Sequence, residues 1–376
     1  RDIGAKLSGG ITHLLNKNNI TSILGEATLK SKTCVEVKTK SEKIELLSNN
    51  IVLATGARAR EIKGLEADGD AIWTYRDALT PKRMPKKLLV IGSGAIGIEF
   101  SSFYNAMGAD TTIIEVLDRI LPNEDKEIAD LAKTQFLKQG MKIFEKSHVV
   151  KLTKGKKNLS VEIETDGKIS KLSFDTIISA VGIVGNVENL GLDEIGIEIK
   201  NSHVLVDEFC KTNVEGVFAI GDLAGAPWLA HKASHEGNMV AELIAGKSPH
   251  SLKPKSIAGC TYCSPQIASV GFTEDEVNEK GIEVKVGRFP FSANGKALAV
   301  GETEGMIKTI FDMNTGELLG AHMIGAEVTE LIHGYVIGRT LEGTEEDFIN
   351  SVFPHPTLSE TMHESVLSAF DRAIHI

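Results

Sequence analysis

Three closely spaced glycines are the first residues of this sequence whose types and spacing indicate a chemical task. The segment Gly92-Ser93-Gly94-Ala95-Ile96-Gly97 follows the apolar run Lys87–Ile91 and opens a helical pattern that ends at Met107. In this setting the first glycine permits a tight turn, the second lets a pyrophosphate approach the backbone, and the third lets the helix pack on the strand. The helix N-terminus favours the phosphate charge, so the motif predicts dinucleotide binding. A close-packed turn without a ligand is the alternative.

An acidic residue follows at the position where a dinucleotide would present its ribose. Glu115 lies 18 positions after Gly97, at the end of a second apolar run, Thr111–Ile114. A carboxylate at the tip of this strand can accept hydrogen bonds from both ribose hydroxyls, and it would repel a 2′-phosphate. The residue therefore predicts NAD rather than NADP.

A histidine between two prolines is the second candidate for chemistry. Pro354 and Pro356 restrict the backbone on either side of His355, and Glu360 is near enough in sequence to accept a hydrogen bond from one ring nitrogen. The other nitrogen could then take up a proton, so the pair has the composition of a general base. A structural histidine is the alternative that this pattern leaves open.

Two further groups resemble reactive sites less closely. Cys260 and Cys263 have the spacing of a redox dithiol, but they precede the strand-like segment Gln266–Val270 and not a helix N-terminus that would stabilise a thiolate. We interpret them as ordinary cysteines at a strand end. His231 and His235 lie four positions apart, yet the order H-E-x-x-H is absent and no third ligand is evident, so we predict no metal site.

The elements that must position these groups can be read from the apolar periodicity. Residues 87–115 predict a strand–helix–strand unit, and Asn123 can cap a following helix that Gly140 ends. Alternation over residues 159–174, with a turn at Asp166-Gly167, and the buried strand Thr176–Ala180 predict a three-strand meander inserted in a doubly wound domain.

The flanking regions have two different characters. Residues 46–57 and 204–222 each run from an apolar strand into a glycine turn, where a ligand could approach the backbone. From about Ser256 the pattern becomes α+β, with a capping box at Thr273–Glu276 and a hairpin of Met306–Phe311 and Leu318–Ile324. We therefore place a domain boundary near residue 256.

The composition limits the classes of protein that these sites can belong to. The chain has 376 residues, 42% of them hydrophobic and 24% charged, which excludes a disordered or fibrous protein. Its net charge of −10 provides no electrostatic basis for binding nucleic acid or an anionic membrane. Four cysteines in so long a chain fit a reducing compartment, and we expect the cytoplasm.

Several stretches together resemble the dihydrolipoamide dehydrogenases, flavin-dependent members of the class I pyridine nucleotide–disulfide oxidoreductase family, over essentially the whole chain. They are Ala54-Thr55-Gly56, Gly92 to Glu99, Glu115, Ala219–Asp222, Leu229–Ala233, Phe289–Asn294 and His355 to Glu360. The resemblance implies an α/β fold with two Rossmann-like dinucleotide-binding domains, the FAD one incomplete here, and a C-terminal α+β dimerisation domain. The implied division is a remnant of the FAD-binding domain in residues 1–68, an NAD-binding domain in 69–188, a second FAD-binding segment in 189–256 and the dimerisation domain in 257–376.

The same resemblance implies roles for particular residues. Those expected to line FAD are Ala27, Ala54, Thr55, Gly56, Asp222, Trp228, Leu229, Ala230 and His231. Those expected to hold NAD are Gly92, Ser93, Gly94, Ala95, Ile96, Gly97, Ile98, Glu99, Glu115, Val150 and Gly182. His355, paired with Glu360, is expected to accept a proton from a dithiol and to reach the active site of the other subunit of a homodimer.

The activity that the resemblance implies is the oxidation of protein-bound dihydrolipoamide to lipoamide with NAD⁺ as hydride acceptor. The protein would serve 2-oxoacid dehydrogenase complexes and meet the lipoyl domains of their acyltransferase. Glutathione-reducing relatives carry arginines where Glu115 stands, and mercuric reductases lack the His–Glu pair, so both features favour lipoamide.

One departure from the family qualifies this expectation. The family begins with an FAD-binding glycine motif followed by a C-x-x-x-x-C disulfide, and neither stretch is found in this sequence. We therefore expect this sequence to be one part of a normal oxidoreductase. This part is expected to be inactive when it is alone. The alternatives are a truncated, non-catalytic chain that binds NAD and dimerises, and a related flavoprotein disulfide reductase with another dithiol substrate.

Overall fold

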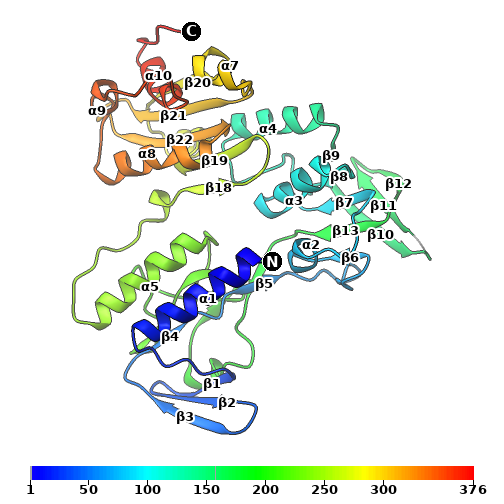
Figure 1. The fold of residues 1–376 in the computed structure, drawn as a ribbon, viewed down its shortest axis with the longest axis vertical. Coiled ribbons are helices and arrows are strands. Elements are labelled where there is room, and N and C mark those ends of the chain that lie inside the picture. Colours follow the sequence, from blue (N-terminus) through cyan, green and yellow to red (C-terminus); the bar gives the residue numbers. More distant parts are fainter. Residues whose placement is uncertain (1, 157) are drawn as a thin grey trace. The chain divides into compact units, whose positions relative to one another are not determined.

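The computed structural model describes residues 2–156 and 158–376, which divide into two compact units (Figure 1). Of these residues, the first unit combines 2–57 with 185–252, and the second combines 58–156 and 158–184 with 253–376. The strands β5 (Ala57–Ala59) and β14 (Ile183–Gly185) lie where the chain passes between the units.

A parallel sheet forms one half of the second unit. Its strand order is β6-β13-β7-β8-β9. The strands are β6 (Ile72–Trp73), β7 (Lys87–Ile91), β8 (Asp110–Ile114), β9 (Lys142–Phe144) and β13 (Thr176–Ser179), and the helices are α2 (Tyr75–Leu79), α3 (Ala95–Ala106) and α4 (Lys126–Lys138). Leu88, Leu89 and Val90 are completely buried, as expected for a central parallel strand that is covered on both faces. The predicted strand–helix–strand unit is confirmed.

Two details of this half differ from the sequence prediction. The antiparallel meander consists of β10 (Ser147–Lys154), β11 (Leu159–Thr165) and β12 (Lys168–Phe174), whereas the segment from Thr176 joins the parallel sheet as β13. All four residues of β13 are buried, which fits a strand inside a covered parallel sheet better than a strand with one exposed face. The cap of α4 is Asp125 rather than Asn123, because the Asp125 side chain accepts the Glu127 N–H.

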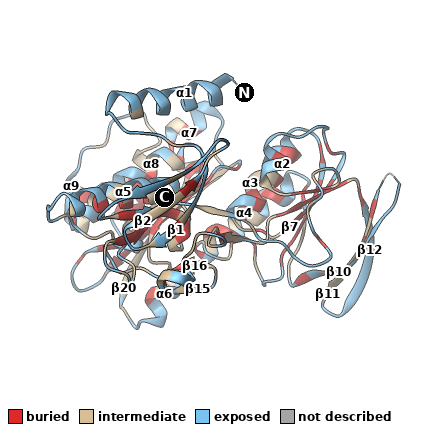
Figure 2. Cartoon of the chain, turned by 90° about the horizontal axis from the view of Figure 1, so that it is seen from below, coloured by how far each residue is buried: buried red, intermediate tan, exposed pale blue. Residues whose placement is uncertain are grey.

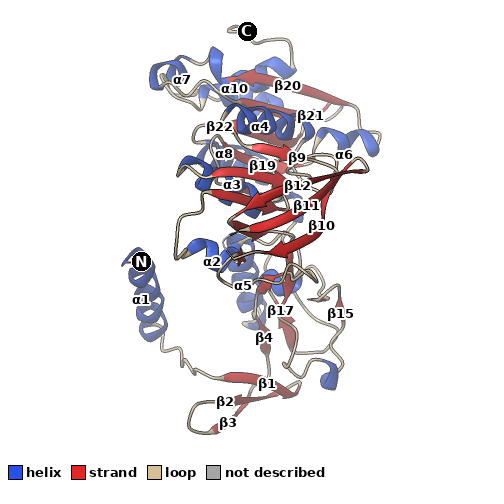
Figure 3. Cartoon of the chain, turned by 90° about the vertical axis from the view of Figure 1, so that its right-hand side faces the viewer, coloured by secondary structure: helices blue, strands red, loops and turns tan. Residues whose placement is uncertain are grey.

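An antiparallel sheet forms the other half of the second unit, in the order β18-β19-β22-β21-β20 (Figure 3). The strands are β18 (Gly259–Thr261), β19 (Gln266–Gly271), β20 (Val284–Pro290), β21 (Met306–Asp312) and β22 (Leu318–Gly325). The helices are α6 (Glu274–Glu279), α7 (Gly295–Val300), α8 (Val328–Thr340), α9 (Glu345–Asn350) and α10 (Glu360–Ala369), with single turns η3 (Pro254–Ser256) and η4 (Phe291–Ala293). The predicted hairpin and the capping box at Thr273 are both confirmed.

The side chains of β21 show how this sheet separates two environments. Ile307 and Phe311 pack with Val328 of α8 and Val366 of α10 in one core. Lys308, between them in sequence, points to the opposite face and contacts Asp125 at the start of α4. Because neighbouring residues of a strand point to opposite faces, the sheet turns one apolar face to α8 and α10. Its other face carries Lys308 and also packs Ile267 and Ile324 against the apolar side chains of α4.

The first unit is built from small sheets and two long helices. Its elements are α1 (Asp2–Lys17), β1 (Glu26–Ser31), β2 (Cys34–Lys38), β3 (Lys43–Leu47), β4 (Ile51–Leu53), η1 (Asp193–Ile195), β15 (Ile199–Lys200), β16 (His203–Val204), β17 (Val217–Ala219), η2 (Gly221–Ala224) and α5 (Ala230–Ile244). β4 and β17 pair in parallel, so both end at the same edge. Figure 2 shows α1 in pale blue, and it buries no residue.

Within the described part of the chain, we find no helix that is long and apolar enough to span a lipid bilayer.

Candidate functional site

The turn between β7 and α3 has the geometry that a pyrophosphate needs. Gly92 adopts a φ of +94°, and a Cβ there would lie 2.5 Å from the Ala180 carbonyl oxygen. A Cβ on Gly97 would overlap the Gly92 carbonyl oxygen, so this glycine lets the helix approach the turn. Gly94, the N-cap of α3, has no atom within 4 Å of its Cβ position. The space above the helix N-terminus is therefore open, and a phosphate group fits it.

Glu115 is already bound to this turn through one of its carboxylate oxygens, and the other oxygen binds the backbone that follows β8. Oε2 accepts hydrogen bonds from the Ser93 hydroxyl at 2.6 Å and from the Ser93 N–H at 2.9 Å, and Oε1 accepts the Leu117 N–H at 3.0 Å. The residue is buried, with 6% exposure. A carboxylate offers about four acceptor positions, so Ser93 and Leu117 hold the side chain while leaving capacity for a ribose hydroxyl. The structure thus brings Ser93 and Glu115 together, a contact that the sequence motif alone did not predict.

The remaining residues expected at NAD lie on three different elements. Ala95, Ile96, Gly97, Ile98 and Glu99 occupy the first turns of α3, Val150 lies half-exposed on β10, and Gly182 follows β13 with a φ of +101°. The Glu99 carboxylate accepts the Tyr262 N–H at 2.8 Å. Burial raises the pKa of the Glu99 carboxyl above its usual value.

Four of the residues expected at FAD lie at one edge of the first unit. Ala54, Thr55 and Gly56 directly follow β4, and Asp222 lies in η2, directly after β17. Ala54 and Thr55 are exposed, and no described residue donates a hydrogen bond to the Asp222 side chain. Backbone ends of parallel strands with an available carboxylate suit the hydroxyl groups of a dinucleotide cofactor.

An ion pair that sequence reasoning missed holds this edge in place. Lys232 and Glu236 of α5 lie 2.8 Å apart and are both buried. Glu236 accepts the Gly221 N–H at 2.7 Å, and Lys232 donates to the carbonyl oxygens of Gly221 at 3.3 Å and Gly225 at 3.1 Å. The pair therefore anchors the loop that carries Asp222. Its i,i+4 spacing was visible in the sequence, but the loop that it binds was not.

The other residues expected at FAD are distributed over the same unit. Leu229 is the N-cap of α5, and Ala230 and His231 form its first turn. Trp228 stacks on His203 with ring centroids 5.8 Å apart, and its Nε1–H donates to His203 Nε2 at 3.2 Å. Ala27 lies exposed on β1, in a separate sheet from β4 and β17.

The structure brings His355 and Glu360 together as the spacing predicts. Nδ1 of His355 lies 3.0 Å from Glu360 Oε1, and the histidine side chain is 78% exposed. Since the carboxylate can only accept, Nδ1 carries the proton and Nε2 is left to accept one. Burial acts to raise the pKa of the Glu360 carboxyl, but hydrogen bonds from the Thr357 N–H and His355 outweigh it and hold this pKa below its usual value. The dyad therefore combines an ionised carboxylate with an accessible imidazole nitrogen.

The two cysteines of the dithiol-like motif lack the environment of a reactive pair. Cys260 and Cys263 are both free thiols. Burial raises the pKa of Cys260, and burial with the nearby Glu99 carboxylate raises the pKa of Cys263 to about 12. Because the thiolate is the reactive form, these values support the interpretation as structural cysteines.

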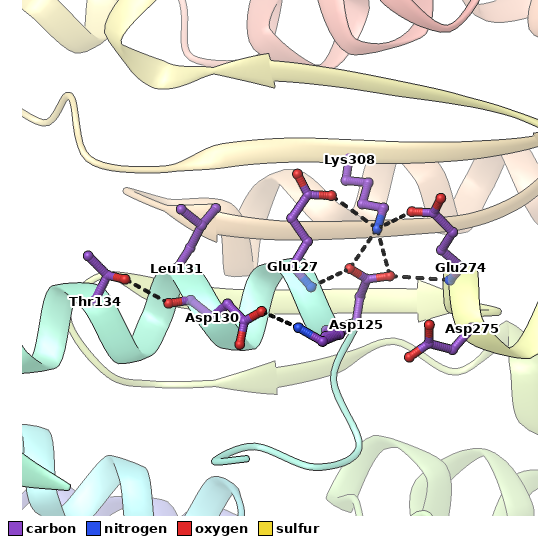
Figure 4. Close-up of a pocket in the computed structure, with 9 residues that line it drawn as sticks. Asp125, Glu127, Asp130, Leu131, Thr134, Glu274, Asp275 and Lys308 are labelled. Carbon is purple, nitrogen blue, oxygen red and sulfur yellow. Dashed lines mark hydrogen bonds and ion pairs between the residues drawn. The ribbon is translucent and has the colours of Figure 1, made fainter. Parts of the chain in front are cut away.

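A pocket of about 400 Å³ in the second unit is lined mainly by acidic side chains (Figure 4). Lys308 reaches it from β21 and contacts Asp125 at 2.8 Å, Glu274 at 2.7 Å and Glu127 at 3.2 Å. The single positive charge of Lys308 is thus shared among three of the five carboxylates that line the pocket. No cluster of at least three potential metal ligands was found among the described residues.

Comparisons with known proteins agree with this geometry. Residues 3–237 match the Pyridine nucleotide-disulphide oxidoreductase family, and residues 257–366 match the dimerisation domain of the same name. Dihydrolipoyl dehydrogenase of Rhizobium etli is 50% identical, and that of Zymomonas mobilis is 51% identical. Both alignments cover 100% of this chain, and they cover 82% and 81% of the respective relatives.

Solved structures show the same fold at lower identity. LpdA from Mycobacterium tuberculosis has a TM-score of 0.91 at 24% identity, and the match covers 97% of this chain and 81% of that one. The HOCl-induced flavoprotein disulfide reductase RclA from Escherichia coli has a TM-score of 0.84 at 24% identity, over 95% of this chain and 83% of that one. Nothing in these matches establishes the expectation of a missing segment, or the inactivity that we predicted from it.

Proposed function

Because this chain belongs to the pyridine nucleotide-disulphide oxidoreductases, we propose that it oxidises dihydrolipoamide to lipoamide with NAD⁺ as the hydride acceptor. Proteins of this family use FAD and NAD(H). FAD, when bound, supplies the redox relay between the dithiol and the nicotinamide. The runs of residues described above at the ends of β4, β17 and β7 are those we propose to hold the two cofactors.

The His355–Glu360 dyad is the observation that carries the proposal. Oxidation of a dithiol releases two electrons and two protons, and a thiol with an ordinary pKa of about 8.5 is mostly protonated at neutral pH. Nε2 of His355 is exposed and free to take up one of these protons, while Glu360 holds Nδ1 and stabilises the resulting charge. In the overall reaction two electrons and one of the two protons would reach NAD⁺ as a hydride, and the other proton would pass to solvent, so that one NADH and one proton are released.

The residues around the glycine turn have a binding role in this proposal. Gly92, Gly94 and the N-terminus of α3 would hold the pyrophosphate, and Glu115, fixed by Ser93, would accept hydrogen bonds from the adenosine ribose. A carboxylate at this position favours NAD⁺ over NADP⁺ because a 2′-phosphate would meet its negative charge.

The test separates the base from the rest of the redox chain. In the flavin-loaded protein, His355→Gln should slow NAD⁺-dependent oxidation of dihydrolipoamide by about 10²- to 10⁴-fold, the range for loss of a general base. NADH oxidation by ferricyanide, which takes electrons directly from the flavin, should change by less than about twofold. Equal losses in both assays would contradict the role assigned to His355.

The proposal includes the assembly in which this base works. The dimerisation domain indicates a homodimer, and we propose that His355 serves the active site of the partner subunit. Lipoyl domains of a 2-oxoacid dehydrogenase acyltransferase are the proposed protein partners. The four free cysteines are consistent with the reducing cytoplasm as the location. The division into residues 1–68, 69–188, 189–256 and 257–376 remains a prediction.

A further inference from the structure

We propose that Asn294 is a positioning residue for the His355–Glu360 dyad, acting through the backbone of Thr357. This inference rests on the function proposed above, because it concerns the residue that we assign as the base. Asn294 does not contact His355, and nothing in its sequence position connects it with residues 355–360.

Asn294 makes two different hydrogen bonds from a buried side chain. The residue is 4% exposed. Its Oδ1 accepts the Ala297 N–H at 2.9 Å and so caps α7, while its Nδ2 donates to the Thr357 carbonyl oxygen at 3.1 Å. One amide therefore links the start of α7 to the loop between His355 and α10.

Thr357 transmits this contact to the dyad. Its N–H donates to Glu360 Oε2 at 2.9 Å, and the other oxygen of Glu360 lies 3.0 Å from His355 Nδ1. Its hydroxyl donates to the Pro354 carbonyl oxygen at 2.7 Å, which ties the loop on the other side of His355. An unbroken series of hydrogen bonds thus runs from Asn294 through Thr357 and Glu360 to the imidazole.

The His355 imidazole is exposed, and it therefore depends on the hydrogen bonds behind Glu360 for its orientation. The His355 side chain is 78% exposed, and its only hydrogen bonds to described residues are those with Glu360. The direction of Nε2 is consequently set by the Glu360 carboxylate, and the position of that carboxylate depends on the Thr357 N–H. A displacement of Thr357 would misorient the base without unfolding the domain.

A helix cap alone does not account for an asparagine here. Capping needs only an acceptor, which serine and aspartate supply about as well as asparagine. The amide donor of Asn294 is the group that reaches Thr357, and neither serine nor aspartate can replace it at that distance. Substitutions that keep the cap and remove the donor therefore isolate the proposed role.

The first experiment compares Asn294→Ser and Asn294→Asp with Asn314→Ser as a matched control. Asn314 lies exposed in the turn between β21 and β22, and its N–H binds the Asp312 carboxylate of the same turn. We expect kcat for dihydrolipoamide oxidation to fall about 10-fold in both Asn294 variants, as for loss of one buried hydrogen bond. The KM for dihydrolipoamide, the rate with ferricyanide and the dimer content should match those of Asn314→Ser, and both Asn294 variants should remain folded at the assay temperature.

A double-mutant cycle decides whether Asn294 acts through Glu360. When Asn294→Ser is added to Glu360→Gln, the further loss should be less than about twofold, because the carboxylate it supports is already gone. A full and independent 10-fold loss in this background would overturn the proposal, as would an unchanged kcat in both single variants. If His355→Gln and Glu360→Gln themselves cause no selective loss, it is the proposed function that fails.

Discussion

Two pairs of basic and acidic side chains in the second unit occupy comparable places and differ in almost every other respect. Asp125 caps α4 and binds Lys308, whereas Glu360 begins α10 and binds His355. The Lys308 side chain is 2% exposed, and the His355 side chain is 78% exposed. Both carboxylates lie at a helix N-terminus, where negative charge is stabilised.

The difference shows how the same residue chemistry can serve packing or reactivity. Lys308 contacts three carboxylates, so its charge is neutralised inside the fold and is not available to a ligand. Burial acts to lower the pKa of the Lys308 ammonium, but its hydrogen bonds to Asp125 and Glu274 outweigh this and raise the pKa above its usual value. His355 has one partner and a free nitrogen. A residue that transfers protons therefore needs a nitrogen atom without a partner inside the protein. A structural ion pair instead needs its charged atoms to be fully occupied by such partners.

Removing the buried cation should produce the largest effect on stability. Lys308→Met keeps the length of the side chain but leaves Asp125 buried without its cation, which should cost about 3–5 kcal/mol in the free energy of unfolding. Urea unfolding followed by circular dichroism measures this. A loss below about 1 kcal/mol would contradict the structural role assigned to the buried ion pair.

Removing the Glu360 carboxylate should lower activity strongly and stability little, the opposite of what we expect for Lys308→Met. Glu360→Gln should lower kcat for dihydrolipoamide by about 30- to 100-fold, because an amide cannot stabilise the imidazolium, and should leave the melting temperature within about 2 °C. Steady-state kinetics and thermal unfolding of the same sample test the two parts. A variant that loses stability and retains kcat would reverse the comparison.

The stability of the protein at alkaline pH should depend on whether Lys308 is present. Since the folded-state pKa of Lys308 is raised above the unfolded value of about 10.4, its contribution is fully present below pH 10 and is lost as the pH rises through the folded-state pKa. Urea midpoints from pH 9 to 11 should therefore fall more steeply for the unsubstituted protein than for Lys308→Met. Parallel curves would exclude this contribution.

Arg288, a more exposed cation that binds two of the same carboxylates, should contribute least to the free energy of unfolding. Arg288 contacts Glu127 at 2.7 Å and Glu274 at 2.9 Å, but its side chain is 39% exposed. Arg288→Met should change the free energy of unfolding by less than about 1 kcal/mol, as for a solvent-screened pair. It is the matched control for Lys308→Met, and an equal loss in both variants would mean that burial does not set the strength of these ion pairs.

Local patterns predicted the elements that carry the candidate site well. The glycine turn, the hairpin of β21 and β22 and the capping box at Thr273 depend on neighbours within a few residues, and all three were found where expected. The cap of α4 was predicted wrongly as Asn123. Asp125 takes this place because Lys308 and the Glu274 N–H also bind its carboxylate, and these partners are 183 and 149 residues away.

What the sequence by itself determined is therefore chemistry of short range: the phosphate-binding turn, the acidic residue after β8, and the pairing of His355 with Glu360 five residues on. Only the tertiary structure decided which of these groups are fixed by hydrogen bonds within the protein and which remain accessible to a ligand. Ser93 binds Glu115, which lies 22 residues on, Glu236 binds the N–H of Gly221, 15 residues before it, and Asn294 reaches Thr357, 63 residues on. Such contacts depend on how sheets and helices pack, and no local periodicity encodes them.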